Sequence, residues 1–156
     1  MSKISIIIPT INEASNLPLL LSDLSSIQKE CEIIIVDSGS KDKTIDIAKI
    51  YGAKVFISKE RNRGFQLDIG ARKSKGDWLI FLHADTRLNY DWIRKTNSFL
   101  EGNKNNIYYF KFKINHKKLI YRLLEILVNF RSKYFKLPYG DQGLICLLYT
   151  SPSPRD

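Results

Sequence analysis

Two stretches decide the fold of this chain: ISIII at residues 4–8 and EIIIV at residues 32–36. Both are rich in β-branched residues and apolar at almost every position, which is typical of strands buried on both faces. Between them, Leu17, Leu20 and Leu24 recur at helical spacing, and Asn16 is expected to cap that helix. Strand, helix and strand in this order predict a parallel unit with a right-handed crossover.

The same alternation continues along the chain. We expect a helix after Asp42, a strand over residues 54–57, a helix that ends at Gly76 and a strand over residues 78–82. A helix near residues 91–100, a strand near 108–114 and a helix near 117–135 follow. The predicted fold class is therefore α/β: a Rossmann-like, doubly wound, mostly parallel sheet with helices on both faces.

Size and composition indicate one ordinary globular domain. The chain has 156 residues, 44% of them hydrophobic and 26% charged, which excludes a disordered or disulfide-rich scaffold. Cys31 and Cys146 are expected to be reduced thiols. No apolar run approaches the roughly 20 residues that cross a bilayer, and the chain starts without a signal peptide, so a cytoplasmic location is predicted.

The net charge of +9 is concentrated in residues 110–137, which carry eight Lys or Arg against Glu125. Such a segment suits nucleic acid, anionic lipid or a phosphorylated substrate. Within it, residues 119–134 carry a broad apolar stripe. We expect this helix to pack against the sheet; the alternative is peripheral contact of residues 117–136 with the inner face of an anionic membrane, where a lipid-linked acceptor would lie.

The last residues, CLLYTSPSPRD at 146–156, break the pattern with a Ser/Pro-rich end that a helix or strand cannot use. We expect a non-native, disordered tail, because the string looks like a translated sequencing adapter. A domain over residues 1–145, truncated at its carboxyl terminus, is the corresponding prediction.

Four polar segments directly follow predicted strands. They are TINE at 10–13, DSGSKD at 37–42, KERNRG at 59–64 and HADT at 83–86. In open α/β sheets, ligands bind outside the carboxyl ends of the strands. We therefore expect all four segments at one rim of the sheet, which forms the candidate site.

IIIPTINE at 6–13, followed by IIVDSGS at 34–40, resembles the opening of family 2 glycosyltransferases, which have the GT-A fold. HADT and YGDQG, at 83–86 and 139–143, are similar to motifs of a bacterial subgroup. The resemblance implies transfer of a sugar from a nucleotide-diphosphate sugar to an acceptor hydroxyl, with inversion. It also assigns four residues to the nucleobase and ribose: Pro9, Thr10, Glu13 and Asp37.

Each assignment has a structural alternative. Asp37 can accept hydrogen bonds from an imide or a ribose hydroxyl, or it can hold a turn. For Ser40 and Asp42, capping of the next helix is the favoured role. Arg63 and Gln66 lie in a stretch that resembles the family's Arg-Gly stretch before its third helix, where a guanidinium can clamp a diphosphate or stack on a base. They are expected at the site, whereas a solvated loop is favoured for Arg61.

Asp85 occupies the place of the last aspartate of the family's Asp-x-Asp motif, and His83 departs from the first. The resemblance implies that both contact the nucleotide sugar and that Asp85 binds catalytic Mg²⁺ or Mn²⁺, shared with substrate phosphates. The ion would neutralise charge on the leaving diphosphate. Capping of the next helix by Asp85 is the alternative.

The general base is expected to be missing, because the acidic pair that supplies it in inverting relatives does not occur here. Asp141 is the fallback catalytic candidate, although the two glycines around it also fit a tight turn. We therefore expect this chain to be inactive in transfer.

Three other functions compete with this interpretation. A nucleotidyltransferase is disfavoured because a glycine-rich basic loop does not follow residues 4–8, and an oxidoreductase because G-x-G-x-x-G is missing there. Nucleic-acid binding through residues 111–136 is the non-enzymatic alternative, but nucleic acid is not the expected partner.

Overall fold

The computed structural model describes residues 4–25, 31–89, 92, 96, 108–109, 119–135 and 143–147. Its elements in chain order are β1 (Ile4–Thr10), α1 (Leu17–Leu24), β2 (Cys31–Asp37), α2 (Thr44–Ile50), β3 (Lys54–Ile57), α3 (Arg63–Lys73), β4 (Trp78–Phe81), β5 (Tyr108–Tyr109), α5 (Leu119–Phe135) and β6 (Leu144–Leu147).

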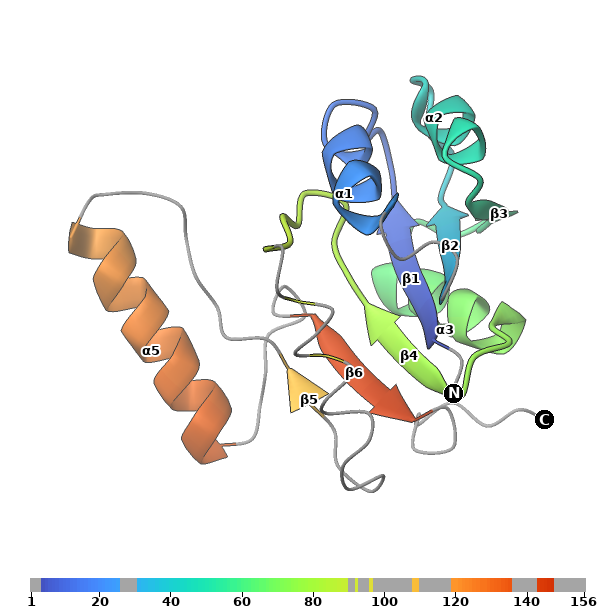
Figure 1. Cartoon of the computed structure of the whole chain (residues 1–156). Helices are drawn as coiled ribbons and strands as arrows, with labels where there is room; N and C mark the ends of the chain where they lie inside the picture. The colour runs from blue at the N-terminus through green and yellow to red at the C-terminus, as the bar shows by residue number, and fades with distance from the viewer. Residues whose placement is uncertain are drawn as a thin grey trace.

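The strands form one sheet in the order β3-β2-β1-β4-β6-β5 (Figure 1). β3, β2, β1 and β4 are parallel, whereas β6 runs antiparallel to β4 and to β5. The four parallel strands confirm the predicted α/β class and the mostly parallel sheet.

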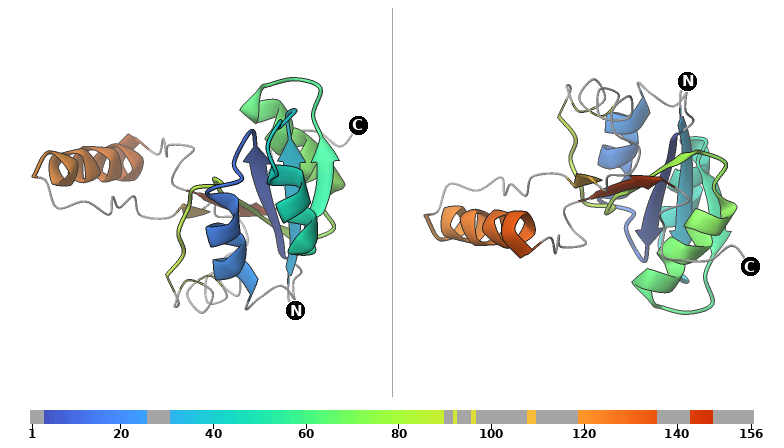
Figure 2. Two further views of the ribbon diagram at one scale, coloured as in Figure 1. Left: turned by 90° about the horizontal axis from the view of Figure 1, so that it is seen from above. Right: turned by 90° about the horizontal axis from the view of Figure 1, so that it is seen from below.

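Helices cover both faces of the sheet, as predicted (Figure 2). Ile6 and Ile8 pack with the leucines of α1, and Ile7 lies in the second core cluster on the side of α3. Because successive strand residues point to opposite faces, a strand covered on both sides must be apolar throughout. Gly70 of α3 lies directly against Ile7, where a Cβ atom would clash with the isoleucine side chain.

β6 is the element that the sequence analysis missed. Leu144–Leu147 pairs with β4, and Ile145 and Cys146 are buried. Burial raises the pKa of the Cys146 thiol to about 11. Cys146 and Leu147 thus belong to the sheet, and the expected end of the native domain near Ile145 stays a prediction. Residues 148–156 lie outside the described part.

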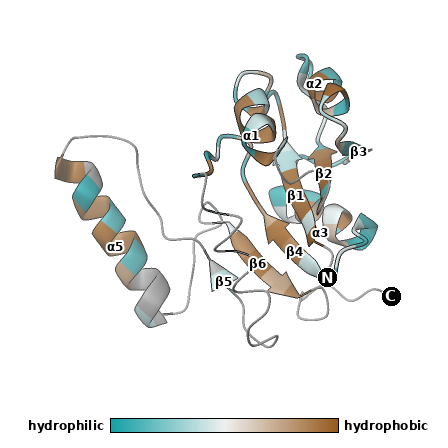
Figure 3. Cartoon of the chain, viewed as in Figure 1, coloured by the Kyte–Doolittle hydropathy of each residue, from teal (hydrophilic) through white to brown (hydrophobic). Residues whose placement is uncertain are grey.

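α5 does not bury its apolar stripe, which corrects the prediction that the stripe packs on the sheet. Figure 1 and Figure 2 both show α5 standing apart from the strands, and apolar residues colour much of its length in Figure 3. Eight large apolar or aromatic side chains are exposed on it: Leu119, Ile120, Leu123, Leu124, Ile126, Leu127, Phe130 and Tyr134. The buried side chains include Glu125 and Val128.

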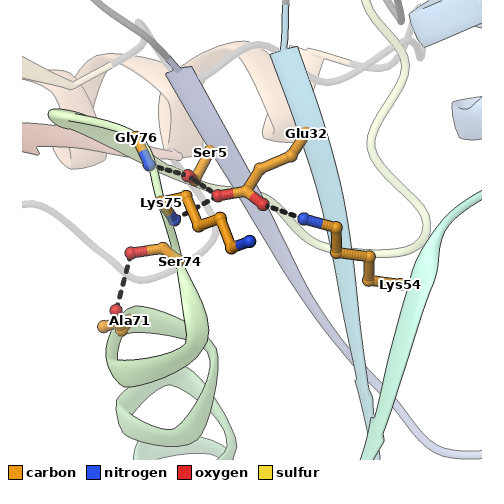
Figure 4. Close-up of polar contacts among 7 residues, drawn as sticks. All are labelled: Ser5, Glu32, Lys54, Ala71, Ser74, Lys75 and Gly76. Atoms are coloured by element: carbon orange, nitrogen blue, oxygen red, sulfur yellow. Dashed lines mark hydrogen bonds and ion pairs between the residues drawn. The ribbon is translucent and has the colours of Figure 1, made fainter.

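A polar network fastens the amino ends of β1 and β2 to the loop before β4 (Figure 4). Glu32 accepts hydrogen bonds from the Ser5 hydroxyl at 2.5 Å, from Lys54 Nζ at 2.6 Å and from the Lys75 backbone nitrogen. The Gly76 nitrogen donates to Ser5 Oγ at 2.8 Å. A Cβ atom on Gly76 would collide with the β1 backbone, so only glycine fits this approach.

Candidate functional site

The four predicted segments begin at the same edge of the sheet. Thr10 pairs with Asp37, and Asp37 pairs with Ile57, so β1, β2 and β3 end side by side. β4 continues past Phe81, and the Leu82 nitrogen donates to the Ile7 carbonyl oxygen at 3.0 Å. We call this edge, with residues 10–13, 37–42, 58–63 and 83–88, the rim.

The first two loops of the rim are tied to each other by hydrogen bonds from backbone nitrogens to side-chain oxygens. Asn12 donates its backbone N–H to Ser40 Oγ and accepts from the Lys41 nitrogen through Oδ1, each at 2.8 Å. The Glu13 nitrogen donates to Thr44 Oγ1, also at 2.8 Å. Asn12 has a φ of 54°, a left-handed conformation that asparagine tolerates better than most residues. The two loops therefore form one platform.

Asp37 is the buried centre of that platform. Its Oδ1 accepts from the backbone nitrogens of Gly39 at 2.9 Å and Ser40 at 2.8 Å. Its Oδ2 accepts from Thr10 Oγ1 at 2.9 Å and Ser40 Oγ at 2.5 Å. Asp37 is 0% exposed and Thr10 is 2% exposed. This geometry favours the turn-holding alternative for Asp37, and contact with a nucleoside stays a prediction.

Asp42 is placed at the start of α2, as predicted. Its Oδ1 accepts from the Thr44 nitrogen at 3.0 Å, and its Oδ2 accepts from the Ala14 nitrogen at 3.1 Å. Hydrogen bonds, first of all from the Thr44 hydroxyl, hold the pKa of Asp42 below its ordinary value. Ser40 does not cap this helix, because its hydroxyl serves Asp37 and the Asn12 nitrogen instead.

Pro9 and Glu13 flank the first loop. Pro9 is buried at the end of β1, and Glu13 is half-buried. Glu13 Oε2 accepts from Asn16 Nδ2 at 3.0 Å. Asn16 stands at the helix start, but its side chain makes no capping hydrogen bond, so the predicted cap is wrong.

Gln66 lies beneath the rim and is 5% exposed. Its Nε2 donates to the carbonyl oxygens of Thr10 at 3.0 Å and Val36 at 2.7 Å. The amide thus ties the carboxyl ends of β1 and β2 together, and its nitrogen is already used within the protein. Asn62 caps α3 by accepting from the Phe65 nitrogen at 3.2 Å, and Arg63 is half-buried in the first turn.

His83 and Asp85 sit in a tight turn after β4. Two hydrogen bonds close the turn. The Thr86 nitrogen donates to the His83 carbonyl oxygen at 3.1 Å, and the His83 nitrogen donates to Thr86 Oγ1 at 3.2 Å. The Asp85 side chain is 70% exposed, and its Oδ1 lies 3.8 Å from His83 Nδ1. An exposed carboxylate at the rim suits a hard cation that takes its other oxygens from phosphates.

The sequence analysis missed a contact between Arg87 of the rim and Asp23 of α1. Arg87 binds Asp23 of α1 through Nε at 2.8 Å and Nη2 at 3.0 Å, and the Leu88 nitrogen donates to the same carboxylate at 3.1 Å. The pKa of Asp23 lies below its ordinary value, and the hydrogen bond from Arg87 is the largest cause. These residues are 64 positions apart, and nothing in their local sequence pairs them.

Two parts of the predicted site are not described by the structure. Asp141 and the rest of residues 139–142 lie outside the described residues, as does the start of the helix expected near residue 91. Within the described residues, no group of three or more His, Cys, Asp or Glu side chains could hold a metal.

A mostly parallel sheet with polar loops at the carboxyl ends of its strands defines the class of α/β domains that bind ligands at that edge. The chain belongs to glycosyl transferase family 2, whose sequence model matches residues 5–148. This confirms the family resemblance read from the two opening motifs.

Two relatives illustrate the similarity. Over 93 residues, the chain is 40% identical to 4,4'-diaponeurosporenoate glycosyltransferase of Staphylococcus haemolyticus. The matched stretch covers 55% of this chain and 25% of the relative. It is 38% identical, again over 93 residues, to a PGL/p-HBAD biosynthesis glycosyltransferase of Mycobacterium bovis, covering 54% of this chain and 36% of the relative. The chain thus spans about a third or less of these relatives.

The fold is also that of solved glycosyltransferases. Glucosyl-3-phosphoglycerate synthase from Mycobacterium tuberculosis, in complex with Mn²⁺, UDP and glucosyl-3-phosphoglycerate, superposes with a TM-score of 0.72. The match covers 95% of this chain and 57% of the synthase at 19% identity. The predicted GT-A fold is confirmed by this likeness.

Proposed function

We propose that this chain forms the donor-binding part of a glycosyltransferase that moves a sugar from a nucleotide-diphosphate sugar to an acceptor hydroxyl, with inversion. The observation that carries the proposal is the rim, where two interlocked loops stand beside the exposed carboxylate of Asp85. Membership in the family and the UDP bound by the structural neighbour support it. Neither the nucleic-acid nor the nucleotidyltransferase alternative is favoured by these relatives.

Within this proposal, the rim residues take two kinds of role. Thr10, Asp37 and Gln66 keep the platform rigid, because their polar atoms are engaged inside the protein. Arg63, at the positive end of α3, is the proposed partner of the diphosphate. A rigid platform lowers the ordering cost of binding a nucleoside.

Asp85 is the proposed ligand of Mg²⁺ or Mn²⁺, with His83 beside it. The cation would supply charge neutralisation on the departing diphosphate. The chemistry of the donors fits: one exposed carboxylate leaves room for phosphate oxygens, and hard cations prefer oxygen. The structural neighbour was solved with Mn²⁺ and UDP, which supports a divalent cation here.

Calorimetric titration with UDP and GDP, each with and without Mn²⁺, tests this proposal. We expect Mn²⁺ to strengthen UDP binding and Asp85→Ala to abolish that gain. Asp77→Ala is the matched control, because Asp77 is an exposed aspartate at the opposite end of β4. Failure of both nucleotides to bind, or equal Mn²⁺ dependence in the two variants, contradicts the proposal.

We propose further that α5 rests on the cytoplasmic face of an anionic membrane, where a lipid-linked acceptor would be met. At 100° per residue, Leu123, Leu127 and Phe130 share one side of α5, and Glu125 and Val128 lie on the other. The apolar side is thus the exposed one. None of the helices in the described part combines the length and hydropathy needed to cross a bilayer.

The charge around α5 favours an anionic surface over a neutral one. Arg122 is exposed on the helix, Arg131 belongs to the same helix, and Lys117, Lys118 and Lys136 lie next to it in the sequence. Each basic residue near such a surface adds about 1 kcal/mol of binding. The remainder of a longer protein and a second copy of the chain are the other candidate partners for this side.

Sedimentation with phosphatidylglycerol vesicles tests the membrane contact. We expect binding that salt weakens and that Leu123→Gln/Leu127→Gln abolishes. Ile50→Gln is the control, because Ile50 is 80% exposed on α2. Lack of binding, or equal binding by all three proteins, would refute membrane contact, and a dimer lost in the double variant would identify the second copy as the partner.

A further inference from the structure

The segment that carries Asp85 is fixed at both ends. At its start, the Leu82 nitrogen bonds to the Ile7 carbonyl of β1, and Ala84 is 1% exposed. At its end, Arg87 and the Leu88 nitrogen both bind Asp23 of α1. Asp85 lies between these anchors with its side chain in solvent.

The second anchor has the geometry of a specific contact. Arg87 offers two nitrogens to the two oxygens of Asp23, at 2.8 and 3.0 Å, which is the bidentate arrangement that fixes a guanidinium in one orientation. The Asp23 side chain is 17% exposed, although that of Arg87 is 60% exposed. Because the Leu88 nitrogen binds the same carboxylate, the contact fixes backbone as well as side chain.

We propose that Asp23 and Arg87 are positioning residues. They hold the Asp85 carboxylate within reach of a cation that is bound to a nucleoside diphosphate. This inference rests on the proposed function and extends it to a second layer of residues. Among the described residues, Asp85 is not part of a group of three or more His, Cys, Asp or Glu side chains. The contacts that fix its turn are the two anchors at Leu82 and at Arg87 and Leu88. Partners of metal ligands typically change metal affinity about 10- to 100-fold when they are removed.

Loss of the Asp23–Arg87 contact should weaken binding of the cation and leave the nucleoside platform unchanged. The platform is held by bonds among residues 10–13, 37–42 and Gln66, and neither Asp23 nor Arg87 takes part in them. Removal of the Asp23–Arg87 contact should therefore weaken Mn²⁺ binding in the presence of UDP, while UDP binding without metal stays the same. A general loss of folding would weaken both.

The test measures Mn²⁺ affinity by electron paramagnetic resonance at saturating UDP, alongside UDP affinity without metal. We expect Arg87→Ala and Asp23→Asn to weaken Mn²⁺ binding about 10-fold or more and Arg87→Lys to have an intermediate effect. Arg72→Ala is the matched control, since it removes a surface ion pair of 2.9 Å with Asp68 on α3. In an Asp85→Asn background, Arg87→Ala should have no further effect.

Each other outcome overturns a defined part of the account. If the unmodified chain binds Mn²⁺ and UDP but Arg87→Ala and Asp23→Asn bind Mn²⁺ equally well, the positioning role is wrong and the proposed function stands. If both variants lose UDP binding without metal in equal measure, the pair merely supports the fold. If the unmodified chain binds neither ligand, the proposed function fails and this inference fails with it.

Discussion

Thr10 and Ser40 lie at the rim and Gln66 lies beneath it, yet the hydrogen-bonding groups of all three side chains already serve the protein. The hydroxyls of Thr10 and Ser40 donate to Asp37, and the amide of Gln66 donates to two backbone carbonyls. A buried polar group that loses its partner costs about 1–3 kcal/mol. These side chains therefore hold the site together whatever binds above them.

Replacement of Asp37 should show this directly. Asp37→Ala leaves two hydroxyls and two backbone N–H groups without their acceptor, so we expect a loss of about 3 kcal/mol in the free energy of unfolding. Ser40→Ala removes one hydroxyl and should cost about 1 kcal/mol. Urea denaturation measures both. Wild-type stability in Asp37→Ala combined with lost UDP binding would instead assign Asp37 to the ligand.

Gln66 should influence the ligand only through the strand ends. Gln66→Leu removes the donor to Thr10 and Val36, and we expect a loss of about 1–2 kcal/mol in stability together with weaker UDP binding. Asn129→Leu is the control, because Asn129 Nδ2 also donates to a backbone carbonyl, that of Glu125 at 2.7 Å, but on α5. It should lower stability without changing UDP affinity; the opposite result contradicts the assignment.

At this scale, sequence predicted where the site lies better than what each side chain does. The positions of Asp37 and Asp85 follow from the ends of apolar strands, which local sequence reveals. Whether a carboxylate is buried in its own loop or open to solvent depends on contacts with residues far away in the sequence. Asp37, for example, is bound by Thr10, which lies 27 residues earlier. Such contacts arise only when the sheet forms.

At the scale of elements, the apolar strands were predicted closely because burial on both faces leaves a continuous signal. The strands predicted over residues 4–8 and 32–36 are observed as Ile4–Thr10 and Cys31–Asp37, and most of their residues are buried. β6 was missed because its four residues adjoin a Ser/Pro-rich tail and gain their place by antiparallel pairing with β4 and β5. Local propensity cannot report a partner that lies more than 60 residues earlier.

The network around Glu32 predicts how stability depends on pH. Partial burial raises the pKa of Glu32, but hydrogen bonds from Lys54, Ser5 and the Lys75 nitrogen outweigh it and lower the pKa below 4.5. A carboxyl whose pKa is lower in the folded state stabilises the fold above pH 4.5, and this contribution is lost as the pH falls through the folded pKa.

Glu32→Gln should therefore cost about 1–2 kcal/mol at pH 7, and its difference from the unmodified chain should shrink as the medium is acidified below 4.5. Glu60→Gln, at an exposed position, serves as the control and should change neither value. Thermal denaturation across this pH range gives the measurement. A difference that stays constant with pH would show that the charge of Glu32 has no stabilising role.

At the scale of the whole molecule, the two ends of the strands have different roles. At the amino ends, the hydrogen bonds of Glu32 and Gly76 hold the fold together, and at the carboxyl ends lies the rim, which is the candidate binding site. α5 stands to the side of β5 and β6 with its apolar side chains exposed (Figure 1), a result that the sequence could not give. The stripe of α5 is equally consistent with packing or exposure until the surrounding surfaces are in place.

The central claim is that a nucleoside diphosphate and its cation bind at the rim. Amide NMR spectra of the chain, recorded with UDP and then with trace Mn²⁺, test it most directly. We predict shifts and Mn²⁺ line broadening confined to the rim, residues 10–13, 37–42, 58–63 and 83–88, and to the first turn of α3, strongest at Asp85. Broadening centred on the Glu32 network or on α5, or spectra that UDP leaves unchanged, would contradict the account.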